Sequence, residues 1–143
     1  MRKLEFDMIP DGCWKYNLRN ILSKKLWDFI KTDAKKKAQG KCHICGKVHK
    51  RLEAHEKWKY DEKNGVIILD DVLALCPDCH KAIHIGRTAL TGDVKKIEDH
   101  YMKVNSCSYV EMKEDLRKAN EVHRRRNQVD EWKMDISWLK RFV

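Results

Sequence analysis

Apolar residues recur at three- and four-residue spacing in three parts of the chain, which is the pattern of amphipathic helices. The first part begins after a capping residue, Ser23, ends at Gly40, and carries its apolar stripe at Leu26, Trp27, Ile30, Ala34 and Ala38. The second follows Asp93, and the third follows Ser108, where Ser108-x-x-Glu111 forms a capping box. The sequence therefore predicts one helix before the middle of the chain and two after it.

The middle of the chain has a different period. Between 51 and 60 the apolar residues alternate, with Glu53, His55 and Lys57 on the other side, which predicts a strand. Asn64-Gly65 is a hairpin turn signal, and the apolar run 66–69 follows it as a second strand. Pro77 then opens a short helix that runs through His80 and His84 to Gly86. The order strand, strand, helix indicates an α+β fold.

The last residues alternate again, with Trp132, Met134 and Ile136 at every second position. Three more apolar residues follow at Trp138, Leu139 and Phe142. We expect this tail to dock on the core as a strand or a short helix. The organisation predicted is one compact domain, with a basic helical extension over 1–40, a core over 41–90 and a helical segment with the docking tail over 91–143.

Cysteines supply the strongest candidate chemistry. Cys42-x-x-Cys45 and Cys76-x-x-Cys79 are separated by 30 residues, and each spacing lets a tight turn direct two sulfurs at one ion. Four thiolates complete a closed tetrahedral shell, so this pattern predicts a structural Zn²⁺ site. Cys13 and Cys107 remain outside it and are interpreted as packing residues.

Histidines predict a second site. His80 and His84 stand four apart on the expected helix, so both rings lie on one face, and the zinc site would fasten that helix to the hairpin carrying His55. Three imidazoles leave coordination positions open for water and a phosphate oxygen, which is a catalytic arrangement. Such a ligand set suits Zn²⁺, Ni²⁺ or Mn²⁺ better than Mg²⁺.

These motifs together carry a family resemblance. Cys42-x-x-Cys45, Leu52-Glu53-Ala54-His55-Glu56 and Leu75-Cys76-Pro77-Asp78-Cys79-His80-x-x-x-His84 resemble the cysteine-framed HNH (ββα-metal) endonuclease motif over about residues 41 to 87. The chain also resembles a broader group of small bacterial and phage HNH proteins with a Trp-rich N-terminal segment. The resemblance implies a ββα-metal core pinned by zinc, flanking α-helices, and DNA hydrolysis with a second divalent metal held by His55, His80 and His84.

The sequence departs from that family at the general base. The residue after the strand histidine is normally a second histidine, and here it is Glu56. Either Glu56 is the base, or His55 is the base and the metal relies on His80, His84 and water; His43 or His49 could substitute in either role. The family's middle asparagine corresponds to Asp71, which the resemblance makes an orienting residue or an additional ligand.

Charge favours a polyanionic partner. Lys and Arg total 31 against 22 acidic residues, a net charge of +9. We predict DNA-backbone contacts, which position DNA without specifying a sequence, at Lys35, Lys36, Lys37, Arg87, Arg124, Arg125 and Arg126. The first residues lack the apolar run of a signal peptide and no stretch is long enough for a membrane span, so we expect a cytoplasmic protein in a bacterium or a phage-infected host. The sequence leaves the oligomeric state undetermined.

Two functions follow as hypotheses. The first is a metal-dependent endonuclease, cutting one strand or both. The second is a catalytically inactive zinc protein on an HNH scaffold that binds DNA or a protein partner as an adaptor or inhibitor. A third interpretation, a purely structural zinc ribbon, leaves the register of His80 and His84 unexplained. Glu56 is the residue that separates the first two hypotheses.

Overall fold

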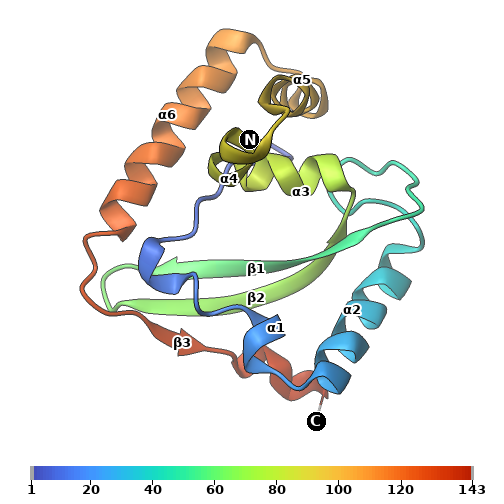
Figure 1. Cartoon of the computed structure of the whole chain (residues 1–143), viewed down its shortest axis with the longest axis vertical. Helices are drawn as coiled ribbons and strands as arrows, with labels where there is room; N and C mark the ends of the chain where they lie inside the picture. The colour runs from blue at the N-terminus through green and yellow to red at the C-terminus, as the bar shows by residue number, and fades with distance from the viewer. Residues whose placement is uncertain (1, 143) are drawn as a thin grey trace.

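The computed structural model describes residues 2–142, and over this range the chain is a mixed α+β protein with a small three-stranded sheet (Figure 1). This confirms the predicted α+β class. The elements are, in chain order, η1 (Asp11–Cys13), α1 (Leu18–Ile21), α2 (Lys24–Ala38), β1 (Glu53–Asp61), β2 (Val66–Leu75), α3 (Pro77–Ile83), α4 (Ile85–Thr91), α5 (Val94–Asn105), α6 (Tyr109–Arg126), β3 (Lys133–Asp135) and η2 (Ser137–Phe142).

The predicted hairpin is present as β1 and β2, which pair antiparallel from Glu53 opposite Leu75 to Asp61 opposite Val66. The apolar run was expected to end at Leu69, but β2 continues to Leu75. A bulge accommodates Asp70 as an extra residue, and pairing with β1 resumes at Asp71. The pairing shifts between Lys57 and Trp58, so Asp70 is left without a strand partner. Its carboxylate lies 3.5 Å from Lys57 Nζ and 3.2 Å from Lys59 Nζ.

The tail docks as predicted, with β3 parallel to β2 and η2 after it. The backbone N–H of Lys133 donates to the carbonyl of Gly65 at 2.7 Å, and Trp132 is buried. Gly65 has φ of 66°, and a Cβ there would lie 2.8 Å from the Glu131 carbonyl oxygen. A single glycine therefore permits both the hairpin turn and the close approach of the tail.

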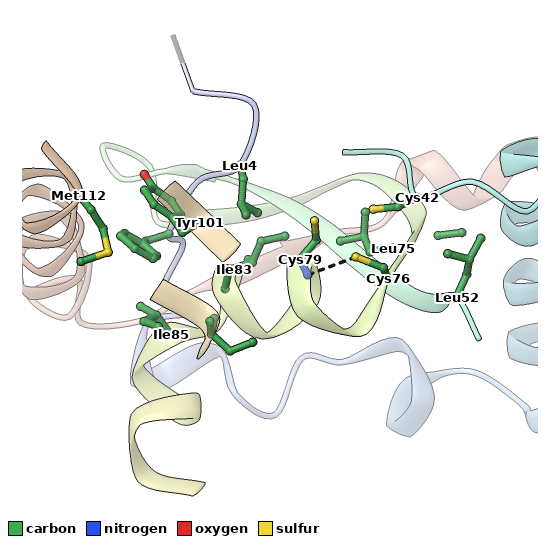
Figure 2. Packing of buried hydrophobic residues seen from close by; sticks show 14 residues of the cluster. Leu4, Cys42, Leu52, Leu75, Cys76, Cys79, Ile83, Ile85, Tyr101 and Met112 are labelled. Carbon is green, nitrogen blue, oxygen red and sulfur yellow. Dashed lines mark hydrogen bonds between the residues drawn. The ribbon is translucent and has the colours of Figure 1, made fainter. Parts of the chain in front are cut away.

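Two hydrophobic clusters form around the hairpin. The first joins α3, α4, α5 and α6 to the N-terminal segment and the ends of the strands, and Figure 2 shows Leu4, Ile83, Tyr101 and Met112 in it together with three of the cysteines. The second contains Trp27, Ile30, Trp58, Ile67 and Trp132, and it joins the sheet to α2 and the tail. The hairpin thus lies between the helices around α3 and those around α2 (Figure 1).

The helix predicted from Pro77 to Gly86 ends earlier than expected. α3 stops at Ile83, His84 has φ of −94° and ψ of 47°, and α4 starts at Ile85. Gly86 lies inside α4 and does not end a helix, because the buried residues Ile85 and Thr88 continue the packing. His84 therefore occupies the joint between two short helices.

Capping accounts for several helix starts. Ser23 caps α2, and the Ser108/Glu111 capping box of α6 has both of its hydrogen bonds. Asp93 precedes α5 without a side-chain capping bond. Within residues 2–142 no helix combines the length and apolar character that crossing a membrane requires.

Candidate metal centres and nucleic-acid contacts

The four cysteines of the two pairs converge. Cys42, Cys45, Cys76 and Cys79 each offer a sulfur, and these four atoms lie within 4.8 Å of one another. Cys45 Sγ and Cys76 Sγ are 3.8 Å apart. Four thiol donors at this separation fit the tetrahedral sulfur shell that Zn²⁺ prefers, so the cluster could hold a metal ion such as zinc.

Local backbone geometry explains why the first pair converges. The N–H of Gly46 donates to the carbonyl of Cys42 at 2.9 Å, and the N–H of Cys42 donates to the carbonyl of Lys47 at 2.9 Å. Gly46 has φ of 75°, which the turn requires and which an L side chain rarely adopts. The N–H of His43 donates to the Ala74 carbonyl, so the turn is fastened to the end of β2.

The second pair occupies the start of α3. Cys76 is the N-cap residue, and its sulfur accepts the backbone N–H of Cys79 at 3.4 Å, the dashed line in Figure 2. Pro77 follows at the first helical position, where its missing N–H costs nothing. The helix start therefore directs both sulfurs to the same side as Cys42 and Cys45.

The cluster is prepared to hold negative charge on sulfur. A hydrogen bond from the Cys79 thiol lowers the pKa of Cys42 to about 4, and the same bond raises the pKa of Cys79. Burial raises the pKa of Cys76 to about 11. A thiolate sharing the remaining protons with its neighbours is the form that a metal ion replaces on binding. Cys13 and Cys107 lie outside the group, in the second hydrophobic cluster and beside the first.

Three histidines also converge, as the sequence predicted. His55 on β1, His80 on α3 and His84 at the joint after α3 place their nearest ring nitrogens within 4.8 Å of one another. Their ring centroids form a triangle with sides of 5.2, 5.4 and 5.0 Å. This group, called the histidine cluster below, has the donor set of a three-histidine metal site.

Burial keeps two of these rings neutral. Burial, together with the smaller effect of the neighbouring imidazoles, lowers the pKa of His55 to about 3 and that of His84 to about 4. Neutral imidazole has a free nitrogen lone pair, which is the form that binds metal ions. His55 as a whole residue is 8% exposed, whereas the side chain of His80 is 26% exposed, so the cluster opens to solvent at His80.

Glu53 is a site residue that the sequence analysis did not assign. Its Oε1 lies 2.9 Å from Nδ1 of His80. A carboxylate accepts the Nδ1 proton, which leaves Nε2 as the metal-binding nitrogen and fixes the orientation of the ring. Strand alternation gave a signal for it, because Glu53 is two residues before His55 and shares its face of β1.

Glu56 is not brought to the histidine cluster. Alternation turns it to the other face of β1, where its Oε1 accepts the backbone N–H of Leu18 at 2.7 Å. Burial raises the pKa of this carboxyl. Asp71 stands opposite Lys57 on β2 and its carboxylate accepts the N–H of Val72, so it is not one of the three clustered ligands.

His100 on α5 is a second residue that sequence reasoning missed. Its Nε2 lies 3.1 Å from the sulfur of Cys79. The sequence offers no local signal for this contact, because α5 reaches α3 only through packing of the first hydrophobic cluster. His43 and His49, which the sequence offered as substitutes for His55 or Glu56, lie outside the histidine cluster.

Of the four arginines predicted to contact DNA, two are paired with carboxylates of the protein and two are exposed. Arg125 forms a bidentate pair with Glu62, and Arg126 lies over the Tyr60 ring, 2.8 Å from Asp7 and only 16% exposed. Arg124 is exposed. Arg87, also exposed, lies in α4 near His84, and its charge is among the causes that lower the pKa of His84.

The three consecutive lysines at the end of α2 also have different surroundings. Lys37 pairs with Asp33 at 3.0 Å, and Lys36 lines a groove along α2 beside Phe29 and Phe142. Lys35 faces a different hollow, next to Arg51 and Glu53. Adjacent helix positions are about 100° apart, so the three consecutive lysines point in different directions.

Comparison of the chain with protein-family models, with curated proteins and with solved structures gave no match.

Proposed function

We propose that the chain is a metal-dependent nuclease that hydrolyses phosphodiester bonds in DNA, with Cys42, Cys45, Cys76 and Cys79 holding a structural zinc and the histidine cluster holding the catalytic ion. The observation that carries the proposal is the convergence of three imidazoles from β1 and from the end of α3. Donors from three protein positions leave part of a metal's coordination sphere for water and substrate. The resemblance to HNH nucleases supports the same assignment, on residues 41 to 87.

The neighbouring residues have distinct roles in this proposal. A divalent ion bound there would polarise the scissile phosphate and stabilise charge on the departing oxygen. Glu53 holds the Nδ1 proton of His80 and so orients that ring. Arg87 adds a positive charge beside His84 that favours approach of a phosphate.

The attacking water needs a proton acceptor. Glu56, one of the two candidates from sequence, faces away from the cluster and bonds to Leu18. Glu53 lies on the correct face, and only its Oε1 is paired with His80, so Oε2 remains to accept a proton from water. We therefore assign Glu53 both the orientation of His80 and the acceptance of this proton.

The test is supercoiled plasmid incubated with zinc-loaded protein and added Mn²⁺, Ni²⁺, Zn²⁺ or Mg²⁺. We expect nicking that His80→Ala abolishes and that His43→Ala, an exposed histidine outside the cluster, leaves unchanged. Nicking that survives His80→Ala would contradict the proposal.

The position of Glu56 favours one alternative. A chain whose expected base faces the other side of its strand could have kept the scaffold and lost the reaction, acting as an adaptor or inhibitor. Absence of nicking with every metal, while DNA or a protein partner is still bound, would support this second function.

A further inference from the structure

A basic hollow of about 470 Å³ borders the histidine cluster. Three segments line it: α2, the residues that leave the first cysteine pair, and the start of β1. The lining residues are Lys35, Gly40, His49, Lys50, Arg51, Leu52 and Glu53.

The charges of this hollow are available to a ligand. Among the described residues, Lys35, Lys50 and Arg51 have no carboxylate within ion-pairing distance, and all three are exposed. The acidic group in the lining, Glu53, bonds to His80. Arg125 and Arg126, by contrast, are tied to Glu62 and Asp7. The hollow therefore gathers three unpaired positive charges, whereas two of the three arginines at the end of α6 are paired.

The basic hollow lies next to the histidine cluster, which distinguishes its charge from the positive charge elsewhere on the surface. Glu53 both lines the hollow and contacts His80, so the hollow adjoins the histidine cluster at this residue. Gly40 lines the hollow with backbone atoms only. A Cβ placed there would meet nothing within 4 Å, so the hollow is open to solvent at this residue. An open basic hollow beside a metal-type site suits an extended polyanion.

We propose that Lys35, Lys50 and Arg51 bind consecutive phosphates of one DNA strand and guide that strand to the histidine cluster; this rests on the proposed function for the identity of the polyanion. Phosphate contacts of this kind give affinity without sequence preference. Each one lost lowers the slope of log affinity against log salt by about 0.9.

The test is binding of a labelled 20-base-pair duplex to the zinc-loaded full chain by fluorescence anisotropy, with no other divalent metal added so that the DNA stays intact. The triple variant Lys35→Gln, Lys50→Gln, Arg51→Gln should bind at least about tenfold more weakly and lose about 2 to 3 from the salt slope. The matched control is Lys103→Gln, Lys113→Gln, Lys118→Gln, which removes the same charge from exposed positions of α5 and α6. It should change affinity less than about threefold, since screened charges at a distance contribute little.

A second triple variant guards against misfolding. Lys35→Arg, Lys50→Arg, Arg51→Lys keeps the charge and should bind as the wild type does. Wild-type binding by the glutamine variant, or an equal loss in the control, would overturn the inference. Displacement by poly-glutamate as effective as by unlabelled DNA would also overturn it and indicate an acidic protein partner.

Failure of the two proposals is distinguishable. If the glutamine variant loses DNA binding and the wild type does not nick plasmid, the nuclease proposal fails and the hollow remains a DNA-binding site. If the wild type nicks plasmid and the glutamine variant binds DNA as the wild type does, only the proposal for the hollow fails.

Discussion

The imidazole of His100 lies 3.1 Å from the sulfur of Cys79, so helix α5 contacts the four-cysteine cluster directly. With a metal on Cys79 the sulfur is a thiolate that can only accept, and Nε2–H of His100 is then the donor. The bond would delocalise charge from a shell of four thiolates and hold α5 against α3.

His100→Ala should therefore weaken zinc retention. Loss of an outer hydrogen bond to a metal ligand costs about 10- to 100-fold in metal affinity. We expect zinc transfer to a colorimetric chelator to be about tenfold faster than from wild type, and transfer from His123→Ala, a histidine on α6 away from the cluster, to be unchanged. Equal transfer rates for the three proteins would refute a role for His100 at the cluster.

Cys42→Ser should remove the structural metal and with it much of the stability of the molecule. Structural zinc contributes on the order of 10 kcal/mol of folding free energy in small domains. We expect zinc content by elemental analysis to fall and thermal unfolding by circular dichroism to lose its cooperative transition. The comparison variant is Cys107→Ser, outside the cluster, which should keep both.

A strong chelator added to the wild type should reproduce the effect of Cys42→Ser, since each treatment removes the same metal–sulfur bonds. Protein that melts identically with and without chelator, and contains no zinc as purified, would show that the four sulfurs bind no structural ion.

Glu53 and Glu56 should have opposite phenotypes, because they face opposite sides of β1. Glu53→Gln leaves the fold intact but weakens Ni²⁺ or Mn²⁺ binding at the histidine cluster by about 10-fold or more, measured by calorimetry on zinc-loaded protein. Glu56→Ala leaves metal affinity unchanged and lowers stability by about 1 to 3 kcal/mol, because it removes the acceptor of the part-buried Leu18 N–H. If metal affinity depends on Glu56 and not on Glu53, the assignment of these two residues is incorrect.

Gly65→Ala and Gly40→Ala separate backbone strain from steric contact. Both glycines have positive φ, at 66° and 77°, and an alanine in this conformation costs about 1 to 2 kcal/mol. Only at Gly65 does the new Cβ meet a backbone atom, the Glu131 oxygen at 2.8 Å. Urea denaturation should show a larger loss of stability for Gly65→Ala, by displacement of the β3 tail, and similar losses for the two variants would contradict this packing.

Residue spacing alone determined the parts of this protein that depend on local geometry. The cysteine pairs, the hairpin turn at Gly65, the caps of α2 and α6 and the docking tail were all predicted, because turns, caps and strand alternation depend on residues close in sequence. The same local rule placed Glu53 beside His55 and Glu56 behind it, although the family resemblance directed attention to Glu56. The joint between α3 and α4 at His84 could not be predicted, since burial of Ile85 in the first hydrophobic cluster overrides the helix-stop signal of Gly86.

Tertiary structure alone decided which charged and polar groups meet across the chain. Arg126 is engaged by Asp7, and His100 reaches Cys79, through contacts between residues 119 and 21 positions apart. Lys35 belongs to the basic hollow while its neighbours Lys36 and Lys37 do not. A sequence pattern specifies the face of a helix or strand on which a side chain lies, but what lies opposite that face is fixed only when the elements pack together.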